Sequence, residues 1–302
     1  MKKTNIIIDT DPGVDDATAI TIALFNKNLD TKLITTTSGN VGINTTTRNA
    51  LYLVERYKKD VPVCKGAEKP LKRISKSASF VHGNDGLGGF VPPKVEKQIC
   101  DENCIDKMFE IIKQNAGNIK IVELAPQTNL GLLFSKYPQA EDMISEIIFE
   151  GGSPYGKQNV KNHISFNISF DPEAADIVMK TKIKKTIVPS EIGRYIAYFS
   201  SNQVEQIKSI NKTGAFLAKM FEGYKSDAIQ KATESNDLCA VMYLLYPQIF
   251  STYKCDIKID LDEMPGKTII TENENGNVVF VEDVNREKFF ELFMENLKNI
   301  KE

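Results

Sequence analysis

Residues 6–16, with the sequence IIIDTDPGVDD, decide how this 302-residue chain begins to fold. The β-branched run Ile6–Ile8 predicts a short buried strand. Pro12 cannot donate a hydrogen bond to a sheet and Gly13 permits a tight turn, so the strand ends before them. From Asp15 onward the sequence DDATAITIALF has a helical pattern. The segment therefore predicts a strand, a tight loop and a helix.

The same segment concentrates negative charge. Asp9, Asp11, Asp15 and Asp16 fall within eight residues. Carboxylates this close repel one another once they leave bulk water, and a hard cation such as Ca²⁺ or Mg²⁺ relieves the repulsion because it prefers oxygen ligands. A single aspartate at a helix start is ordinarily a cap. Four acids around a Pro-Gly turn instead favour a metal site or a catalytic site.

Composition bounds the remaining possibilities. Of the 302 residues 41% are hydrophobic, which suffices for one large α/β domain or two modest ones. The 38 basic and 40 acidic side chains nearly cancel, so no basic excess suggests a nucleic-acid surface. Three apolar residues before Asp9 are too few for a signal-peptide core, and no apolar run is long enough to span a membrane. We therefore expect a cytoplasmic protein with no nucleic-acid or membrane partner.

Cysteine usage agrees with a reducing compartment. An odd number of cysteines without framework spacing predicts free thiols. Cys100 and Cys104 are four residues apart and fit one helix face, where structural thiols are expected rather than a zinc site. The five cysteines are Cys64, Cys100, Cys104, Cys239 and Cys255.

Expected strands and helices alternate along the chain without a repeat or a linker. This pattern predicts one α/β domain, residues 1–302, with a mainly parallel (mixed) Rossmann-like central sheet flanked by helices. The expected strands are Ile6–Ile8, Lys32–Thr37, Val61–Cys64, Lys120–Leu124, Ile144–Phe149, Lys185–Val188, Tyr253–Ile259, Thr268–Thr271 and Asn277–Val281. The expected helices are Asp16–Lys27, Thr45–Lys58, Cys104–Ala116, one that starts at Asp171, several between Val188 and Tyr246, and Asn285–Lys298, while residues 66–98 form a long excursion.

Polar turn segments follow most of the first five expected strands. They read DTDPG, SGN, the excursion from Gly66, LAPQTN and EGGS. Ligands of open α/β sheets bind at the carboxyl ends of the strands. We therefore expect these segments to converge at the edge that holds the acidic cluster.

The opening segment resembles the signature of the inosine–uridine-preferring nucleoside hydrolases. Further matches to that family follow in the same order: TTTSGN at 35–40, HGNDG at 82–86, LAPQTN at 124–129, Phe166-Asn167 with DPEAA at 171–175, and NDLCAV at 236–241. The resemblance implies the nucleoside hydrolase fold and a calcium-dependent enzyme that cuts the N-glycosidic bond between ribose and a nucleobase. It also implies a homodimer or homotetramer.

The resemblance implies a role for each matched residue. Asp11, Asp16, Asp237 and the backbone carbonyl of Leu124 would bind calcium, and Asp11 would act as general base on a calcium-bound water. Asp9 would organise these ligands from behind. Asp15, Asn40 and Asn167 would bind the ribose hydroxyls, and Asn159 and Ser165 would lie at the 5′ end of the substrate-binding site. His82 would be a catalytic residue near the nucleobase.

This division of residues suits the chemistry. Breaking an N-glycosidic bond builds positive charge on the sugar, which carboxylates stabilise. Calcium lowers the pKa of bound water and holds sugar hydroxyls. Asparagine both donates and accepts hydrogen bonds, as recognition of a hydroxyl requires.

Three positions depart from the family pattern. Asn236 occupies the catalytic position of a histidine that can protonate the leaving base, and asparagine cannot act as an acid near neutral pH. Ser165 replaces a glutamate that holds the ribose 5′-hydroxyl. Glu150 stands where methionine is common, and it either restores the lost carboxylate at the substrate or is a surface acid. Both interpretations of Glu150 stay open.

Other polar and aromatic side chains receive simpler interpretations. His163 is expected to be a solvated loop residue. Tyr195 and Tyr198 fit one helix face and either lie in the core, which is favoured, or form an aromatic wall for the base. Tyr224 has no assignment from the sequence alone. No tryptophan is present to stack on a purine, although phenylalanine or tyrosine can stack.

Three other functions remain as alternatives. Asn236 and Ser165 motivate a calcium-dependent ribosyl-ligand binding protein with weak catalysis, or a hydrolase for an atypical ribosyl compound. A haloacid dehalogenase phosphatase also begins with a strand and an Asp-x-Asp motif, but Gly13 stands where that class needs threonine or valine. The sequence does not distinguish purine from pyrimidine substrates.

Overall fold

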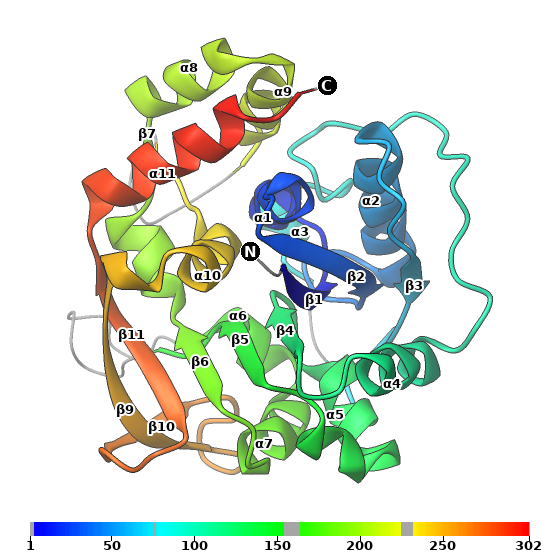
Figure 1. The fold of residues 1–302 in the computed structure, drawn as a ribbon, viewed down its shortest axis with the longest axis vertical. Helices are drawn as coiled ribbons and strands as arrows, with labels where there is room; N and C mark the ends of the chain where they lie inside the picture. The colour runs from blue at the N-terminus through cyan, green and yellow to red at the C-terminus, as the bar shows by residue number, and fades with distance from the viewer. Residues whose placement is uncertain (1–2, 75–76, 154–163, 225–231, 302) are drawn as a thin grey trace.

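A computed structural model of the chain describes residues 3–74, 77–153, 164–224 and 232–301. Its centre is a nine-stranded sheet with the order β10-β9-β11-β6-β5-β4-β1-β2-β3 (Figure 1). Neighbouring strands are parallel from β3 to β11, and β9 is antiparallel to both of its neighbours. The strands are β1 Thr4–Thr10, β2 Leu29–Thr36, β3 Val63–Lys65, β4 Ile119–Glu123, β5 Glu146–Glu150, β6 Lys185–Val188, β9 Phe250–Ile259, β10 Thr268–Glu272 and β11 Val278–Val284.

Helices cover both faces of this sheet, as Figure 1 shows. Helices α1, α2 and α8 to α11 pack in the hydrophobic core on one face, and α4, α5 and α7 pack in the core on the other. The helices are α1 Val14–Phe25, α2 Ile43–Arg56, α3 Ser79–His82, α4 Cys104–Gln114, α5 Thr128–Lys136, α6 Phe166–Phe170, α7 Pro172–Lys180, α8 Ser201–Ile210, α9 Lys212–Phe221, α10 Asn236–Leu245 and α11 Arg286–Lys298. Short 3₁₀ turns η1 Pro138–Asp142 and η3 Pro247–Ile249 and a π-helical turn η2 Ile192–Ile196 complete the connections.

Strand β1 shows why the opening sequence folds as it does. Successive side chains of a strand point to opposite faces, so Ile6 and Ile8 pack in one core and Ile7 in the other. All three are fully buried, as a central parallel strand requires. β1 lies between β4 and β2, where the direction of strand succession reverses. This switch point is where open α/β sheets bind ligands.

The expected mixed α/β sheet is confirmed, and each expected strand is present with ends displaced by a few residues. Helices dominate between Val188 and Tyr246, as expected, but β7 (Phe199–Ser200) and β8 (Ala232–Thr233) also form a small antiparallel sheet there that was not expected. Strands of two residues are too short to show a periodicity in sequence. Within the described ranges, no helix has the length and apolar character needed to cross a bilayer.

Candidate active site

A cavity of about 340 Å³ lies at the carboxyl ends of the central strands. Five of its wall residues lie at or after the ends of β1, β2, β4, β5 and β6, namely Asp15, Asn40, Leu124, Glu150 and Ser190. The expected convergence of strand ends is therefore confirmed. The rest of the wall comes from the excursion after β3, from residues around α6, from η2 and from the start of α10.

The start of α1 fixes the first acids of the cavity. Asp16 Oδ2 accepts a hydrogen bond from Gly13 N at 2.8 Å, and Asp16 Oδ1 accepts one from Thr10 Oγ1 at 2.5 Å. Asp16 therefore caps α1, which is the simpler role expected for an aspartate at the start of a helix. Its oxygens also face the other acids of the site, so the cap does not exclude a second role.

Helix α10 brings a distant acid to the same place. Asp237 lies in its first turn, and α10 packs against α1. One carboxylate oxygen each from Asp15, Asp16 and Asp237 lies within 4.8 Å of the others, and all three residues are buried. The structure thus brings Asp237 beside Asp16, as the metal assignment requires. Asp11 is not a member of this group of three, although the resemblance assigns it to the metal and Asp15 to the ribose.

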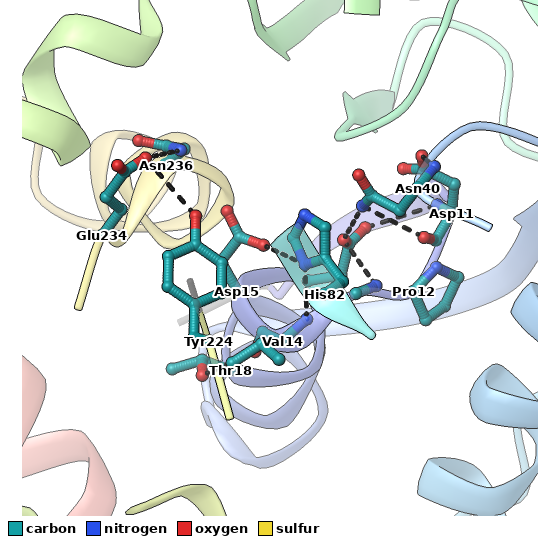
Figure 2. A network of polar contacts seen from close by, with 12 residues as sticks. Asp11, Pro12, Val14, Asp15, Thr18, Asn40, His82, Tyr224, Glu234 and Asn236 are labelled. Atoms are coloured by element: carbon teal, nitrogen blue, oxygen red, sulfur yellow. Dashed lines mark hydrogen bonds and ion pairs between the residues drawn. The ribbon is translucent and has the colours of Figure 1, made fainter. Parts of the chain in front are cut away.

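Asn40 ties Asp11 to the cluster (Figure 2). Its backbone N–H donates to Asp11 Oδ2 at 2.6 Å, and its Nδ2 donates to Asp16 Oδ2 at 3.1 Å. Asp11 Oδ1 and Asp15 Oδ1 are buried and accept no hydrogen bond from any described residue. These two oxygens therefore have lone pairs to spare for a ligand.

The electrostatics of the cluster favour a cation. Burial raises the pKa values of Asp11, Asp15 and Asp237, and the charges of neighbouring aspartates raise them further. A divalent cation among them would reverse this effect and stabilise the carboxylates. The backbone carbonyl of Leu124, on the cavity wall, adds a neutral oxygen. A set made only of oxygens fits a hard cation.

Glu150, at the end of β5, is 5% exposed and faces the cavity. Its Oε2 accepts from Asn167 Nδ2 at 2.8 Å and its Oε1 from Ser190 Oγ at 2.6 Å. Burial raises the pKa of this carboxyl to about 7. The interpretation of Glu150 as a surface acid is therefore wrong.

The other residues expected at the ribose 5′ end are placed differently. Ser165 is 1% exposed, lies before α6 and is not among the wall residues of the cavity. Its Oγ packs against Gly151, so closely that a Cβ atom at that glycine would lie only 3.1 Å from it. The same Oγ has no hydrogen-bond partner among the described residues. Asn159 and His163 lie outside the described residues.

His82 ends α3 and is 5% exposed on the cavity wall. Its Nδ1 accepts a hydrogen bond from Val14 N at 3.3 Å and lies 3.9 Å from Asp15 Oδ1. Burial lowers the pKa of His82 to about 4, although Asp16 and Glu234 raise it. His82 is therefore neutral near pH 7, with its proton on Nε2, and can donate a hydrogen bond but not the proton of an imidazolium.

Sequence reasoning missed a polar network on the cavity wall. Glu234 Oε2 accepts from Asn236 Nδ2 at 3.1 Å, Arg194 Nε at 3.2 Å and Tyr224 Oη at 3.4 Å. Figure 2 shows Tyr224 between Glu234 and His82, and its ring meets the His82 ring at 5.3 Å. Glu234 and Arg194 could have been found from their positions, since Glu234 precedes the matched Asn236-Asp237 pair and Arg194 follows a strand end.

Two tyrosines expected in the core lie elsewhere. Tyr195 lines the cavity, so the favoured placement in the core was wrong and the alternative placement on the cavity wall agrees with the structure. Tyr198 is partly exposed and lies under the Arg286 guanidinium, whose Cζ is 3.8 Å from the ring centroid. The two rings lie three residues apart at the end of η2, where the chain leaves helical geometry, so a helix-face argument does not apply.

A mostly parallel sheet with a buried acid cluster at its switch point is an arrangement typical of α/β proteins that bind a ligand or carry out catalysis at the strand ends. Residues 6–291 match the family model described as inosine-uridine preferring nucleoside hydrolase, and the chain belongs to that family. It is 33% identical to the non-specific ribonucleoside hydrolase RihC of Salmonella typhimurium over 256 residues, which are 85% of this chain and 83% of that protein.

Solved structures agree with this assignment. A plant nucleoside hydrolase, PpNRh1, superposes with a TM-score of 0.89 at 29% identity, over 98% of this chain and 99% of that one. A purine-preferring ribonucleoside hydrolase from Gardnerella vaginalis superposes with a TM-score of 0.90 at 26% identity, over 97% and 98%. The fold and the family therefore exclude the phosphatase alternative.

Proposed function

We propose that the chain hydrolyses the N-glycosidic bond of ribonucleosides in a calcium-dependent reaction that gives free base and ribose. The observation that carries this proposal is the buried group Asp15, Asp16 and Asp237 beside Asp11, at the switch point of a nucleoside hydrolase fold. We expect the enzyme to be a homodimer or homotetramer, as the resemblance implies, and to be cytoplasmic, as its cysteine usage predicts.

Asp11, Asp16, Asp237 and the Leu124 carbonyl would hold the calcium ion. The unpartnered Oδ1 of Asp11 and the mutual repulsion of the carboxylates support this choice. When bound, the ion would lower the pKa of water and bind sugar hydroxyls.

The side chains then divide the work on the sugar. Asp11 takes the proton of the attacking water at Oδ1, while Asn40 N holds its other oxygen. Asp15 stabilises the positive charge that develops on the ribose ring. Asn40 and Asn167 orient the hydroxyls, and Asn167 Nδ2 lies 3.0 Å from the Leu124 carbonyl oxygen.

At the 5′ end, Glu150 takes the place of the carboxylate that Ser165 lacks. Asn167 and Ser190 each occupy one of its oxygens, and each oxygen has a further lone pair for the 5′-hydroxyl. Ser165 supports this end from behind, and Asn159 would close it. At the other end of the substrate, His82 donates its Nε2–H to the nucleobase.

Release of reducing sugar from purine and pyrimidine ribonucleosides tests the proposal. We expect release with at least one nucleoside, loss of release on chelation with EGTA, and recovery on addition of Ca²⁺. If the folded, calcium-loaded protein releases ribose from none of them, the weakly catalytic binding protein becomes the better description.

Two single variants test the roles within the cluster. Asp11→Ala should abolish turnover and weaken Ca²⁺ binding in calorimetry, whereas Asp15→Ala should reduce turnover more than it reduces Ca²⁺ binding. Asp101→Ala, at an exposed loop position, is the control and should change neither. The opposite order of calcium affinities would assign the metal to Asp15 in place of Asp11.

A further inference from the structure

The charges on the cavity wall are unevenly distributed. Four wall residues are acids: Asp15, Glu150, Glu234 and Asp237. Among the described wall residues, Arg194 alone carries a permanent positive charge. It lies in η2, shortly after the carboxyl end of β6.

Glu234 fixes the orientation of this guanidinium. Arg194 Nε donates to Glu234 Oε2 at 3.2 Å, and the Glu234 side chain is 2% exposed while that of Arg194 is 30% exposed. The carboxylate raises the pKa of Arg194 against the effect of burial. Within the described part of the chain, neither terminal nitrogen of Arg194 donates a hydrogen bond. The planar group therefore keeps its terminal N–H donors available to a ligand in the cavity.

The guanidinium shares its anchor with two other wall residues. Asn236 Nδ2 and Tyr224 Oη donate to the same oxygen of Glu234, and the Tyr224 ring contacts the His82 ring (Figure 2). Asn236 has a neutral amide, and His82 Nδ1 accepts a hydrogen bond from Val14 N, which leaves a neutral imidazole with its proton on Nε2. This side of the cavity therefore has one fixed cation and no strong proton donor among its described residues.

The proposed reaction requires such a cation. The C1′–N bond breaks and its electron pair leaves with the nitrogen, so the sugar becomes positive and the base negative. Water forms the new C1′–O bond and gives one proton to Asp11, and the released base takes a proton from solvent. The anionic base is the high-energy species when no acid protonates it.

We propose that Arg194, oriented by Glu234, stabilises the negative charge of the departing nucleobase by donating hydrogen bonds from its terminal nitrogens to a ring nitrogen or carbonyl oxygen of the base. This inference rests on the proposed nucleoside hydrolysis and names the group that replaces an acid in it. Arg194 keeps its own proton throughout, since a guanidinium does not deprotonate at working pH. Glu234 is a positioning residue in this scheme.

Two substrates with different leaving groups test the proposal. Uridine or inosine needs stabilisation of its leaving base, whereas 4-nitrophenyl β-D-ribofuranoside releases an anion that is stable without help. Arg194→Gln should lower kcat/KM for the nucleoside about 100-fold, the cost of losing one donor aimed at developing charge. It should lower kcat/KM for the nitrophenyl riboside less than about tenfold. Arg194→Lys, which keeps the charge, should recover part of the loss on the nucleoside.

Matched variants separate the effect from structural damage. Glu234→Gln should show the same difference between substrates at a smaller size, because it loosens the guanidinium without removing it. Arg73→Gln is the control, because Arg73 Nε also forms an ion pair, with Glu173 at 2.8 Å, away from the cavity wall. It should change neither rate.

The possible outcomes decide between the two proposals. Equal losses of kcat/KM on both substrates would overturn the inference, because Arg194 would then serve the ribosyl group or the fold. No loss of kcat/KM on either substrate would also overturn it. A difference between substrates in both Arg194→Gln and Glu234→Gln would support it. A wild-type protein that hydrolyses neither compound would overturn the proposed function, and this inference with it.

Discussion

The two ends of the parallel sheet hold their buried charges in different ways. At the amino end, Glu146 begins β5 and is almost fully buried. Its carboxylate forms ion pairs with Lys120 Nζ at 2.6 Å and Lys184 Nζ at 2.9 Å. It also accepts a hydrogen bond from Thr186 Oγ1 at 3.0 Å. Next to it, the fully buried Lys185 donates to two backbone carbonyls. The charges at this end are satisfied within the fold.

The carboxyl end has the opposite character. Asp11 and Asp15 each leave one buried oxygen without a hydrogen bond from the described residues. Burial and like charges raise the pKa values of three of the aspartates there. A buried charge without a partner costs several kcal/mol, on the order that metal binding or substrate binding can offset. The contrast indicates that charges at the amino end have partners within the fold, where the Glu146 ion pairs stabilise it, and that those at the carboxyl end have oxygens available to ligands.

The largest expected effect comes from the carboxyl end. Asp237→Asn should lower kcat/KM for nucleosides by about 10³-fold, because it removes a carboxylate from the cation and the reacting sugar. In calcium-free protein the same change should raise the free energy of unfolding by about 1–2 kcal/mol, because it removes a buried charge beside Asp15 and Asp16. Steady-state kinetics and urea unfolding in EGTA measure the two quantities. If Asp237→Asn instead lowers the free energy of unfolding of the calcium-free protein, the carboxylates at the carboxyl end have partners within the fold, as Glu146 has at the amino end.

Glu146→Gln should show the reverse pattern at the amino end, with unchanged kcat/KM and a free energy of unfolding about 1–2 kcal/mol lower. The expected decrease in the free energy of unfolding is small because the side chains of Lys120 and Lys184 are 30% and 55% exposed, so that solvent screens their charges. The two lysines lower the pKa of Glu146 against the effect of burial. Its stabilisation is thus complete above the unfolded carboxyl pKa of about 4.3 and is lost as pH falls through the folded value.

Urea unfolding of wild type and Glu146→Gln at neutral pH and in acid tests this prediction. The difference between the two proteins should shrink on acidification. Equal stability at neutral pH would show that the pairs at the amino end contribute nothing, and the contrast between the two ends would fail.

The difference between the ends also explains what the sequence could predict. The acid cluster was predictable because Asp11, Asp15 and Asp16 are close in sequence and the strand-end rule gives their place. The sheet was predictable from strands of β-branched residues followed by turns. Asp237 required the family resemblance, since no local pattern links it to the other acids.

Arg194 and Glu234 could each be found from their sequence positions, but their pairing was not predictable, because they lie on separate segments that only the folded chain brings together. The burial of Glu150 depends on donors from two further segments, Asn167 and Ser190. Helix α5 was missed because it begins at Thr128, inside the LAPQTN segment that was interpreted only as a turn. The sequence therefore did not show which polar side chains form hydrogen bonds or ion pairs with residues of distant segments.

The smallest expected effect tests the amino end most finely. Lys185 lies in the run KIKK at 182–185, and nothing in that sequence shows which lysine is buried. Burial lowers its pKa to about 8, although Glu141 raises it. Below that pH both folded and unfolded chains bind the proton, so the folded chain bears the full cost of the buried charge. Between about 8 and the unfolded value of about 10.4 the unfolded chain binds more protons, so stability rises with pH.

Lys185→Met should therefore be more stable than wild type by about 1 kcal/mol at neutral pH, and this advantage should shrink toward about pH 10. The carbonyls that lose Lys185 keep a donor, because Asn277 Nδ2 lies 3.1 Å from Thr181 O and 3.4 Å from Ile183 O. Activity should not change, since Lys185 is at the opposite end of β6 from the cavity. Urea unfolding across this pH range measures the difference. An advantage that grows with pH, or a loss of activity, would show that this buried cation is coupled to the site and that the two ends are not independent.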